Sequence, residues 1–87
     1  MKANIKRYVK ERDEMLAKRD LGELEKFIRT HAQFYPEGFA EQFAAAGEEL
    51  RLCALHKMIV NAFNLPADFR KESAMWLVSR GFNLEIM

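Results

Sequence analysis

The segment from Leu50 to Phe63 constrains the fold of this chain more than any other. At about 100° per residue, its apolar side chains and His56 cover roughly half of a helical wheel. They are Leu52, Cys53, Leu55, His56, Ile59, Val60, Ala62 and Phe63. A surface helix needs a narrower apolar stripe. The pattern therefore predicts a helix over about residues 50–63 that is buried on more than one side.

Two helices are predicted before the first clear break in the chain. An amphipathic pattern with i,i+4 opposite charges predicts a helix from about Ala3 to Lys18. A second helix begins at Asp20, because Asp20 and Glu23 have the spacing of a capping box, and ends near residues 32–33. The break follows at Phe34–Gly38, since proline disfavours helical geometry at the residue before it.

Gly47 decides how the next segment is divided. A third helix is predicted from Pro36 or Glu37, and its apolar face rotates to nearly the opposite side beyond Gly47. Either one long helix is packed on different sides along its length, or Gly47 separates two helices. Glycine inside a helix costs about 1 kcal/mol relative to alanine, which favours a break or bend.

The C-terminal part predicts one more helix with signals at both ends. Pro66 and Asp68 suit its first turn, and Gly81 followed by Phe82 is typical of a Schellman motif. Residues 83–87 are expected to form a short tail that is partly docked through Leu84 and Ile86. The fold class predicted is all-α: one domain over residues 1–87, a compact bundle of four to five helices around a buried central helix.

Charge is unevenly distributed along the 87 residues, although the net charge is only +1. Basic side chains dominate residues 1–19, and acidic ones dominate residues 20–49. One interpretation is that the two segments face each other, or face a neighbouring copy. The other is a basic patch for nucleic acid or an acidic patch for a basic partner.

No reaction can be assigned from the sequence, so an enzyme, a cofactor or a metal site is not expected. Phosphate-binding glycine loops, nucleophile elbows and metal-ligand spacings are absent from the sequence. The one candidate set of side chains for a metal or redox site is Cys53, His56 and His31. The favoured alternative for His56 is a packing histidine bonded to a backbone carbonyl, and Cys53 fits a buried free thiol in a reducing compartment.

Met75 and Val78 lie away from the apolar stripe of the last helix, three residues apart and near Lys71. Two apolar side chains together on an exposed face suggest an edge that another chain covers. A chain of this size buries a small core, so a homo-oligomer or a partner-covered surface is expected. With no signal peptide and no apolar run of ~20 residues, the expected location is the cytoplasm.

Four stretches of the chain resemble small, uncharacterised helical proteins encoded by bacteriophages and prophages. These stretches are Ile5-Lys6-Arg7-Tyr8, Glu11-Arg12-Asp13-Glu14-Met15-Leu16, Leu55-His56-Lys57-Met58-Ile59, and Trp76-Leu77 before Gly81-Phe82. The alanine-rich Phe39–Gly47 stretch departs from that group. No activity is assigned to the group, so no catalytic residue can be transferred.

The resemblance implies a setting in a bacterial host, where small phage proteins commonly bind a host or phage macromolecule. The leading hypothesis is therefore a non-enzymatic binding protein that blocks a host-defence nuclease, as anti-CRISPR proteins do. The alternatives are a nucleic-acid-binding module that uses the basic first helix, and a structural oligomeric phage accessory protein. The candidate partner-binding residues are Lys6, Arg7, Lys10, Glu14, Glu41, Glu48, Met75 and Val78.

Overall fold

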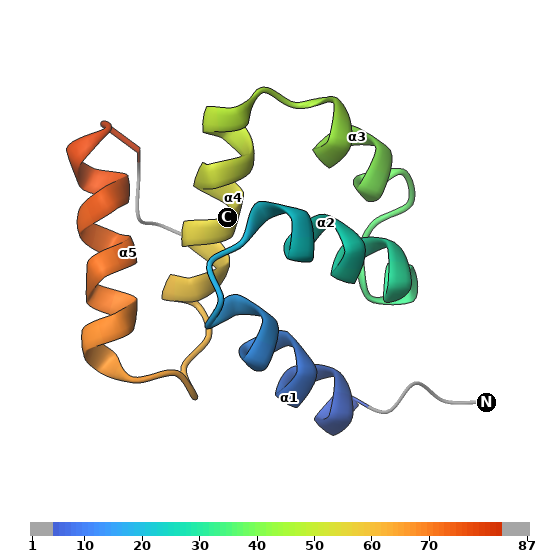
Figure 1. The fold of residues 1–87 in the computed structure, drawn as a ribbon, viewed down its shortest axis with the longest axis horizontal. Coiled ribbons are helices and arrows are strands. Elements are labelled where there is room, and N and C mark those ends of the chain that lie inside the picture. The colour runs from blue at the N-terminus through green and yellow to red at the C-terminus, as the bar shows by residue number, and fades with distance from the viewer. Residues whose placement is uncertain (1–4, 83–87) are drawn as a thin grey trace. The chain divides into compact units, whose positions relative to one another are not determined.

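A computed structural model describes residues 5–82 of the chain, and all regular structure in this range is helical (Figure 1). The elements are α1 (Ile5–Leu16), α2 (Leu21–Thr30), the 3-10 helix η1 (Ala32–Phe34), α3 (Phe39–Ala45), α4 (Glu48–Val60) and α5 (Ala67–Ser79). The predicted all-α class is confirmed, and the described residues form five α-helices where four to five were predicted. The expected helix start at Ala3 and the docking of Leu84 and Ile86 lie outside the described residues.

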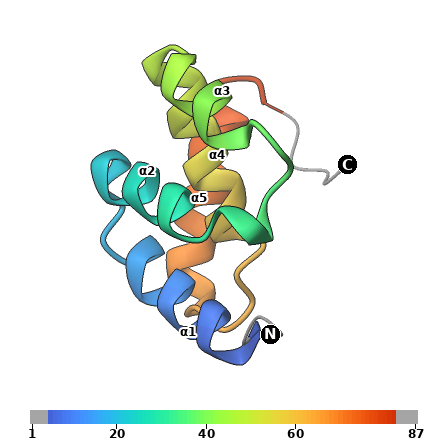
Figure 2. The same ribbon diagram turned by 90° about the vertical axis from the view of Figure 1, so that its right-hand side faces the viewer.

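The elements form two compact units, residues 1–46 and 47–87. In the first unit, α1 and α3 each pack against α2 (Figure 2). The buried side chains of this unit come from all three helices: Met15, Leu16, Leu24, Phe27, Ile28 and Phe43. Each helix thus contributes an apolar face, as the sequence spacing predicts.

Asp20 sets the point at which α2 begins. Its backbone is extended, and its side-chain oxygen accepts a hydrogen bond from the Glu23 amide at 3.0 Å. The first helical amide groups lack partners within the helix, so this bond satisfies one of them. The predicted N-cap is confirmed. Between α1 and α2, Arg19 reverses the chain with a φ of 51°.

In the second unit, α4 and α5 form an antiparallel helical hairpin (Figures 1 and 2). The buried residues of α4 are Cys53, Leu55 and Ile59. At 3.6 residues per turn, Cys53 and Leu55 point about 160° apart around the helix. The prediction that this helix is buried on more than one side is therefore confirmed.

The bounds of α4 differ from the predicted 50–63. The helix ends at Val60, where the Ala62 amide donates to the Ile59 carbonyl, three residues back, at 3.0 Å, and the Asn61 side chain donates to the Lys57 carbonyl at 2.8 Å. Phe63, placed by the wheel in the buried arc, lies beyond this end and is 74% exposed. The wheel misplaced it because it assumed that helical geometry continues up to the turn at Pro66.

Gly47 separates α3 from α4, which confirms the predicted break. Its φ of −66° and ψ of 163° are extended, and it precedes the first residue of α4. Backbone groups at this position leave the helical pattern, so the apolar faces of α3 and α4 are set independently. This explains why the apolar stripe changes sides here.

The C-terminus of α5 is a Schellman motif, as predicted. The Phe82 amide donates to the Leu77 carbonyl at 2.9 Å, and the Gly81 amide donates to the Val78 carbonyl at 3.0 Å. Gly81 has a φ of +80°, in the left-handed region. The Phe82 ring lies parallel to the Trp76 ring with centroids 6.1 Å apart, which supplies the hydrophobic contact of the motif.

Replacing Gly81 with alanine should lower the free energy of unfolding by about 1 kcal/mol, because a Cβ disfavours the left-handed conformation. Urea unfolding followed by circular dichroism measures the loss. The matched control is Gly47→Ala, where the backbone is extended and no atom lies within 4 Å of the added Cβ. We expect its effect to stay below about 0.5 kcal/mol. Equal losses in the two variants would contradict this account.

Candidate functional site

The predicted partner-binding residues are all exposed, and they lie on both units. Lys6, Arg7, Lys10 and Glu14 are on α1, Glu41 is on α3, Glu48 is on α4, and Met75 and Val78 are on α5. They form two groups, each on a single helix. The charged residues of α1 make up the first group, and Met75 and Val78 on α5 make up the second. Their role in binding a partner stays a prediction.

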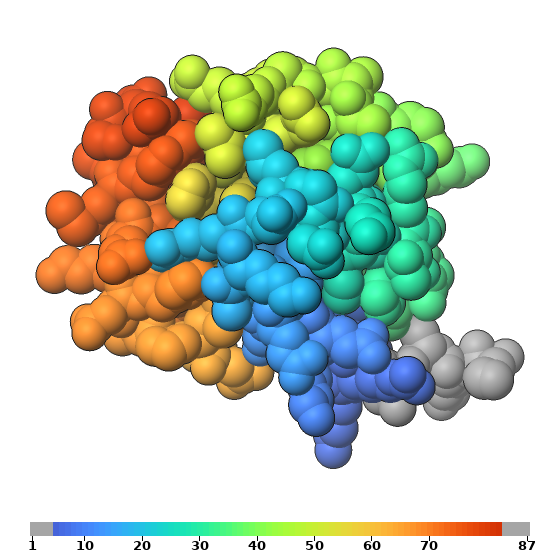
Figure 3. Space-filling view, viewed as in Figure 1, coloured from blue at the N-terminus to red at the C-terminus, as the bar shows by residue number. Residues whose placement is uncertain are grey.

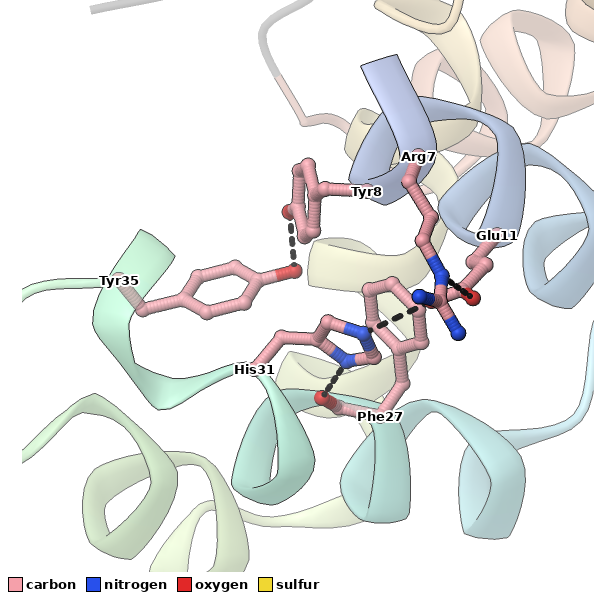
Figure 4. Close-up of polar contacts among 6 residues, drawn as sticks. All are labelled: Arg7, Tyr8, Glu11, Phe27, His31 and Tyr35. Atoms are coloured by element: carbon pink, nitrogen blue, oxygen red, sulfur yellow. Dashed lines mark hydrogen bonds and ion pairs between the residues drawn. The ribbon is translucent and has the colours of Figure 1, made fainter. Parts of the chain in front are cut away.

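Arg7 belongs to a polar cluster that joins α1 to the end of α2 (Figure 4). Its Nε donates to the Glu11 carboxylate at 3.0 Å, and the other oxygen of that carboxylate lies 3.0 Å from His31 Nε2. The Arg7 charge is therefore partly compensated within α1. Arg12 likewise pairs with Asp13 at 3.0 Å, so two of the cations in the basic N-terminal segment have carboxylate partners within the segment itself.

Both ring nitrogens of His31 face oxygen atoms. Nδ1 lies 3.1 Å from the Phe27 carbonyl, and Nε2 lies 3.0 Å from Glu11 Oε1. Because a carbonyl and a carboxylate are acceptors, both contacts are hydrogen bonds when both nitrogens carry hydrogen. The ring also stacks on Phe27 with centroids 4.1 Å apart. His31 therefore links the end of α2 to α1 within the first unit.

Two tyrosines complete this cluster: Tyr8 lies on α1, and Tyr35 directly follows η1. The Tyr8 hydroxyl donates to the Tyr35 hydroxyl at 2.7 Å, across 27 positions of sequence (Figure 4). Tyr8 also stacks on Phe34 with centroids 4.0 Å apart. Burial, followed by the bond from Tyr8, raises the pKa of Tyr35 well above its ordinary value. These contacts were missed by the sequence analysis, because no local spacing signals a pair so distant in sequence.

His56 lies in a packed arrangement within the second unit. Its Nδ1 lies 2.9 Å from the hydroxyl of Ser73, and its ring stacks on Trp76 with centroids 4.3 Å apart. Ser73 is fully buried, so its hydroxyl is not open to a substrate. Cys53 is buried as well. Within residues 5–82, no group of three His, Cys, Asp or Glu side chains is placed to hold a metal ion.

Two hollows of the surface are candidates for binding. A groove of about 740 Å³ lies in the first unit, along the end of α2, η1 and the start of α3. An almost wholly apolar hollow of about 410 Å³ lies on α5, lined by Ala74, Met75, Val78 and Ser79. The sequence pointed to the second hollow through Met75 and Val78. Of the predicted partner-binding residues, only Glu41 lines the groove of the first unit.

Searches with models of known families, among curated proteins and among solved structures found nothing that matches this chain. The resemblance to phage proteins therefore stays a prediction. In the part of the chain that the structure describes, no helix has the length and apolar character needed to cross a bilayer.

Replacing Arg7 with glutamine should raise the pKa of Glu11 toward its ordinary value of 4.5. The Arg7 hydrogen bond is the largest cause of the lowered pKa, and the His31 bond is the next. The side-chain carboxyl resonance in an NMR pH titration measures the change. Arg29→Gln, which removes a similar i,i+4 pair with Glu25, is the control and should leave Glu11 unaffected.

The lowered pKa of Glu11 also fixes the direction of its pH effect. A carboxyl with a depressed pKa in the folded state stabilises the fold above its unfolded pKa, and this contribution is lost as the pH falls through the folded pKa. Glu11→Gln should therefore flatten the decrease of stability between neutral and acidic pH. An unchanged pH profile would show that the cluster does not contribute to stability.

Tyr8→Phe removes the donor to Tyr35 and should lower the free energy of unfolding by about 1 kcal/mol. The variant retains one tyrosine, since the chain has only two. Its tyrosinate absorbance therefore reports Tyr35 directly. Burial is the larger cause of the raised pKa, so ionisation should still occur above pH 10. A midpoint at the ordinary value would contradict the buried position of this phenol.

Proposed function

We propose that this chain is a non-enzymatic, phage-encoded binding protein that inhibits a host-defence nuclease, such as a CRISPR effector, by covering part of its surface. The observation that carries the proposal is the apolar edge of α5, formed by Met75 and Val78. These side chains are 62% and 59% exposed. The resemblance to small phage proteins supplies the class of partner.

The apolar edge lies opposite the buried side of α5. Ser73 and Leu77 are fully buried, and each points about 160° away from Met75 around the helix. On the adjacent side, Trp76 is held between His56 and Arg80, whose guanidinium lies 4.3 Å from the ring centroid. The helix is therefore anchored from behind, and Met75 and Val78 need no rearrangement to meet a partner.

The chemistry of the edge suits a protein surface as its partner. The hollow around it is lined almost wholly by apolar atoms, and contiguous exposed apolar surface marks interaction sites. Methionine adapts its shape to varied apolar surfaces, because its side chain is unbranched and its sulfur is polarisable. Burial of this edge would supply binding energy without any reaction, which agrees with inhibition by steric blocking.

The double variant Met75→Glu, Val78→Glu should abolish binding to the partner. Removing central apolar contacts costs about 2 kcal/mol or more in typical interfaces, and the added charges would be buried without partners. Pull-down and cleavage-inhibition assays against a panel of purified nuclease effectors measure the loss. Leu50→Glu is the control, since Leu50 is similarly exposed at 60% but lies on α4.

Three results would contradict the proposal. The first is the absence of any effector binding at micromolar concentration by the unmodified chain. The second is equal loss of binding in the Leu50→Glu control. The third is a concentration-dependent mass in sedimentation that the double variant abolishes, because the edge would then be a homo-oligomer interface, as the structural accessory hypothesis requires.

A further inference from the structure

The groove of the first unit combines an apolar floor with an acidic rim. Ile28 is buried beneath it, and Phe39 is half-buried beside it. Ala32 and Ala40 also line the groove, and their small side chains leave it open. Its volume of about 740 Å³ lies within the ordinary range of binding sites, roughly 300–1,000 Å³. The atoms of α2 and α3 adjoin at the surface in the space-filling view (Figure 3).

The acidic and basic side chains around the groove differ in whether they have an ion-pair partner. Glu37 and Glu41 are exposed, and neither carboxylate has an ion-pair partner within residues 5–82. The single cation in the lining, Arg29, already pairs with Glu25 at 3.4 Å. Among the residues that the structure describes, the rim therefore presents negative charge without a cationic partner directly beside the apolar floor.

One wall of the groove is fixed before any partner arrives. Tyr35 stacks on Phe39 with ring centroids 5.2 Å apart, and its hydroxyl accepts the bond from Tyr8. The stacking of Tyr8 on Phe34 holds the adjoining η1 segment. A preformed wall lowers the entropy cost of binding, because fewer side chains must be ordered when the complex forms.

We propose that this groove binds a segment of a partner protein in which an apolar side chain is flanked by lysine or arginine. The apolar side chain would lie on the floor, and the flanking cations would pair with Glu37 and Glu41. Charge complementarity selects this occupant, since an acidic segment would meet two like charges at the rim. The groove is a second docking surface, and the argument for it does not depend on the edge of α5.

The proposal is tested with three synthetic 14-residue peptides. The first arranges leucine and lysine as an amphipathic helix, the second replaces its lysines with glutamate, and the third contains lysine without leucine. Only the first should shift the amide NMR resonances of Gln33, Phe39 and Ala40 in a saturable manner. Absence of such shifts, or equal shifts with the lysine-only peptide, would overturn the proposal.

Charge-reversing variants locate the interaction. Glu41→Lys should weaken binding of the leucine–lysine peptide by about three- to tenfold, since an attractive rim pair becomes repulsive. Asp68→Lys is the matched control, because Asp68 is also an exposed acid in the first turn of a helix. Equal weakening in both variants would show that binding follows net charge, and it would overturn the assignment to the groove.

A steric variant tests the apolar floor separately. Ala32→Trp adds a large side chain at an exposed position in the groove and should abolish the peptide-induced shifts. Ala44→Trp is the control, since Ala44 is exposed on α3 outside the lining. Circular dichroism checks that both variants fold. Retained binding by a folded Ala32→Trp variant would overturn the proposal.

Two further measurements separate the remaining outcomes. The Met75→Glu, Val78→Glu variant should bind the peptide as the unmodified chain does, so failure of the edge and failure of the groove are distinguishable. Sedimentation of the chain without peptide reports self-association. A concentration-dependent mass that Glu41→Lys abolishes would overturn the proposal, because a second copy of the chain would then fill the groove.

Discussion

The pairing of Tyr8 with the η1 segment is the constraint on which the first unit depends. One side chain of α1 donates to Tyr35 and stacks on Phe34, so it fixes the chain immediately after α2. This contact determines where the chain turns toward α3, and hence the wall of the groove. The His31–Glu11 contact joins α1 to the same region from the other side. The polar cluster thereby holds in place the segment that forms the wall of the groove.

The second unit uses the same principle with different residues. His56 bonds the buried Ser73 and stacks on Trp76, which locks α5 against α4. A buried hydroxyl is costly unless it is hydrogen-bonded, so His56 and Ser73 are best understood as partners in packing. In both units a histidine holds helices together. In both units the surface offered to solvent is set by contacts behind it.

Features determined by neighbours in sequence were predicted well, whereas those determined by distant residues were not. The Asp20 cap, the break at Gly47 and the Schellman motif at Gly81 each follow from a few adjacent residues with definite backbone preferences. The Tyr8–Tyr35 and Glu11–His31 contacts require the fold to bring together residues 27 and 20 positions apart. The end of α4 was overestimated because the change of pattern there, in which the Ala62 amide bonds the Ile59 carbonyl three residues back, gives no signal on a helical wheel.

The exposure of Met75 makes the outer face of α5 susceptible to oxidation. A thioether open to solvent is readily converted by peroxide to the sulfoxide, which is polar and chiral. The buried Met15 is shielded from the same reagent. Among the methionines of residues 5–82, oxidation would therefore change Met75 on the outer face of α5 before the buried Met15. A preparation that is folded by every spectroscopic criterion could then carry a damaged edge, and its integrity is better judged by intact mass than by helical content.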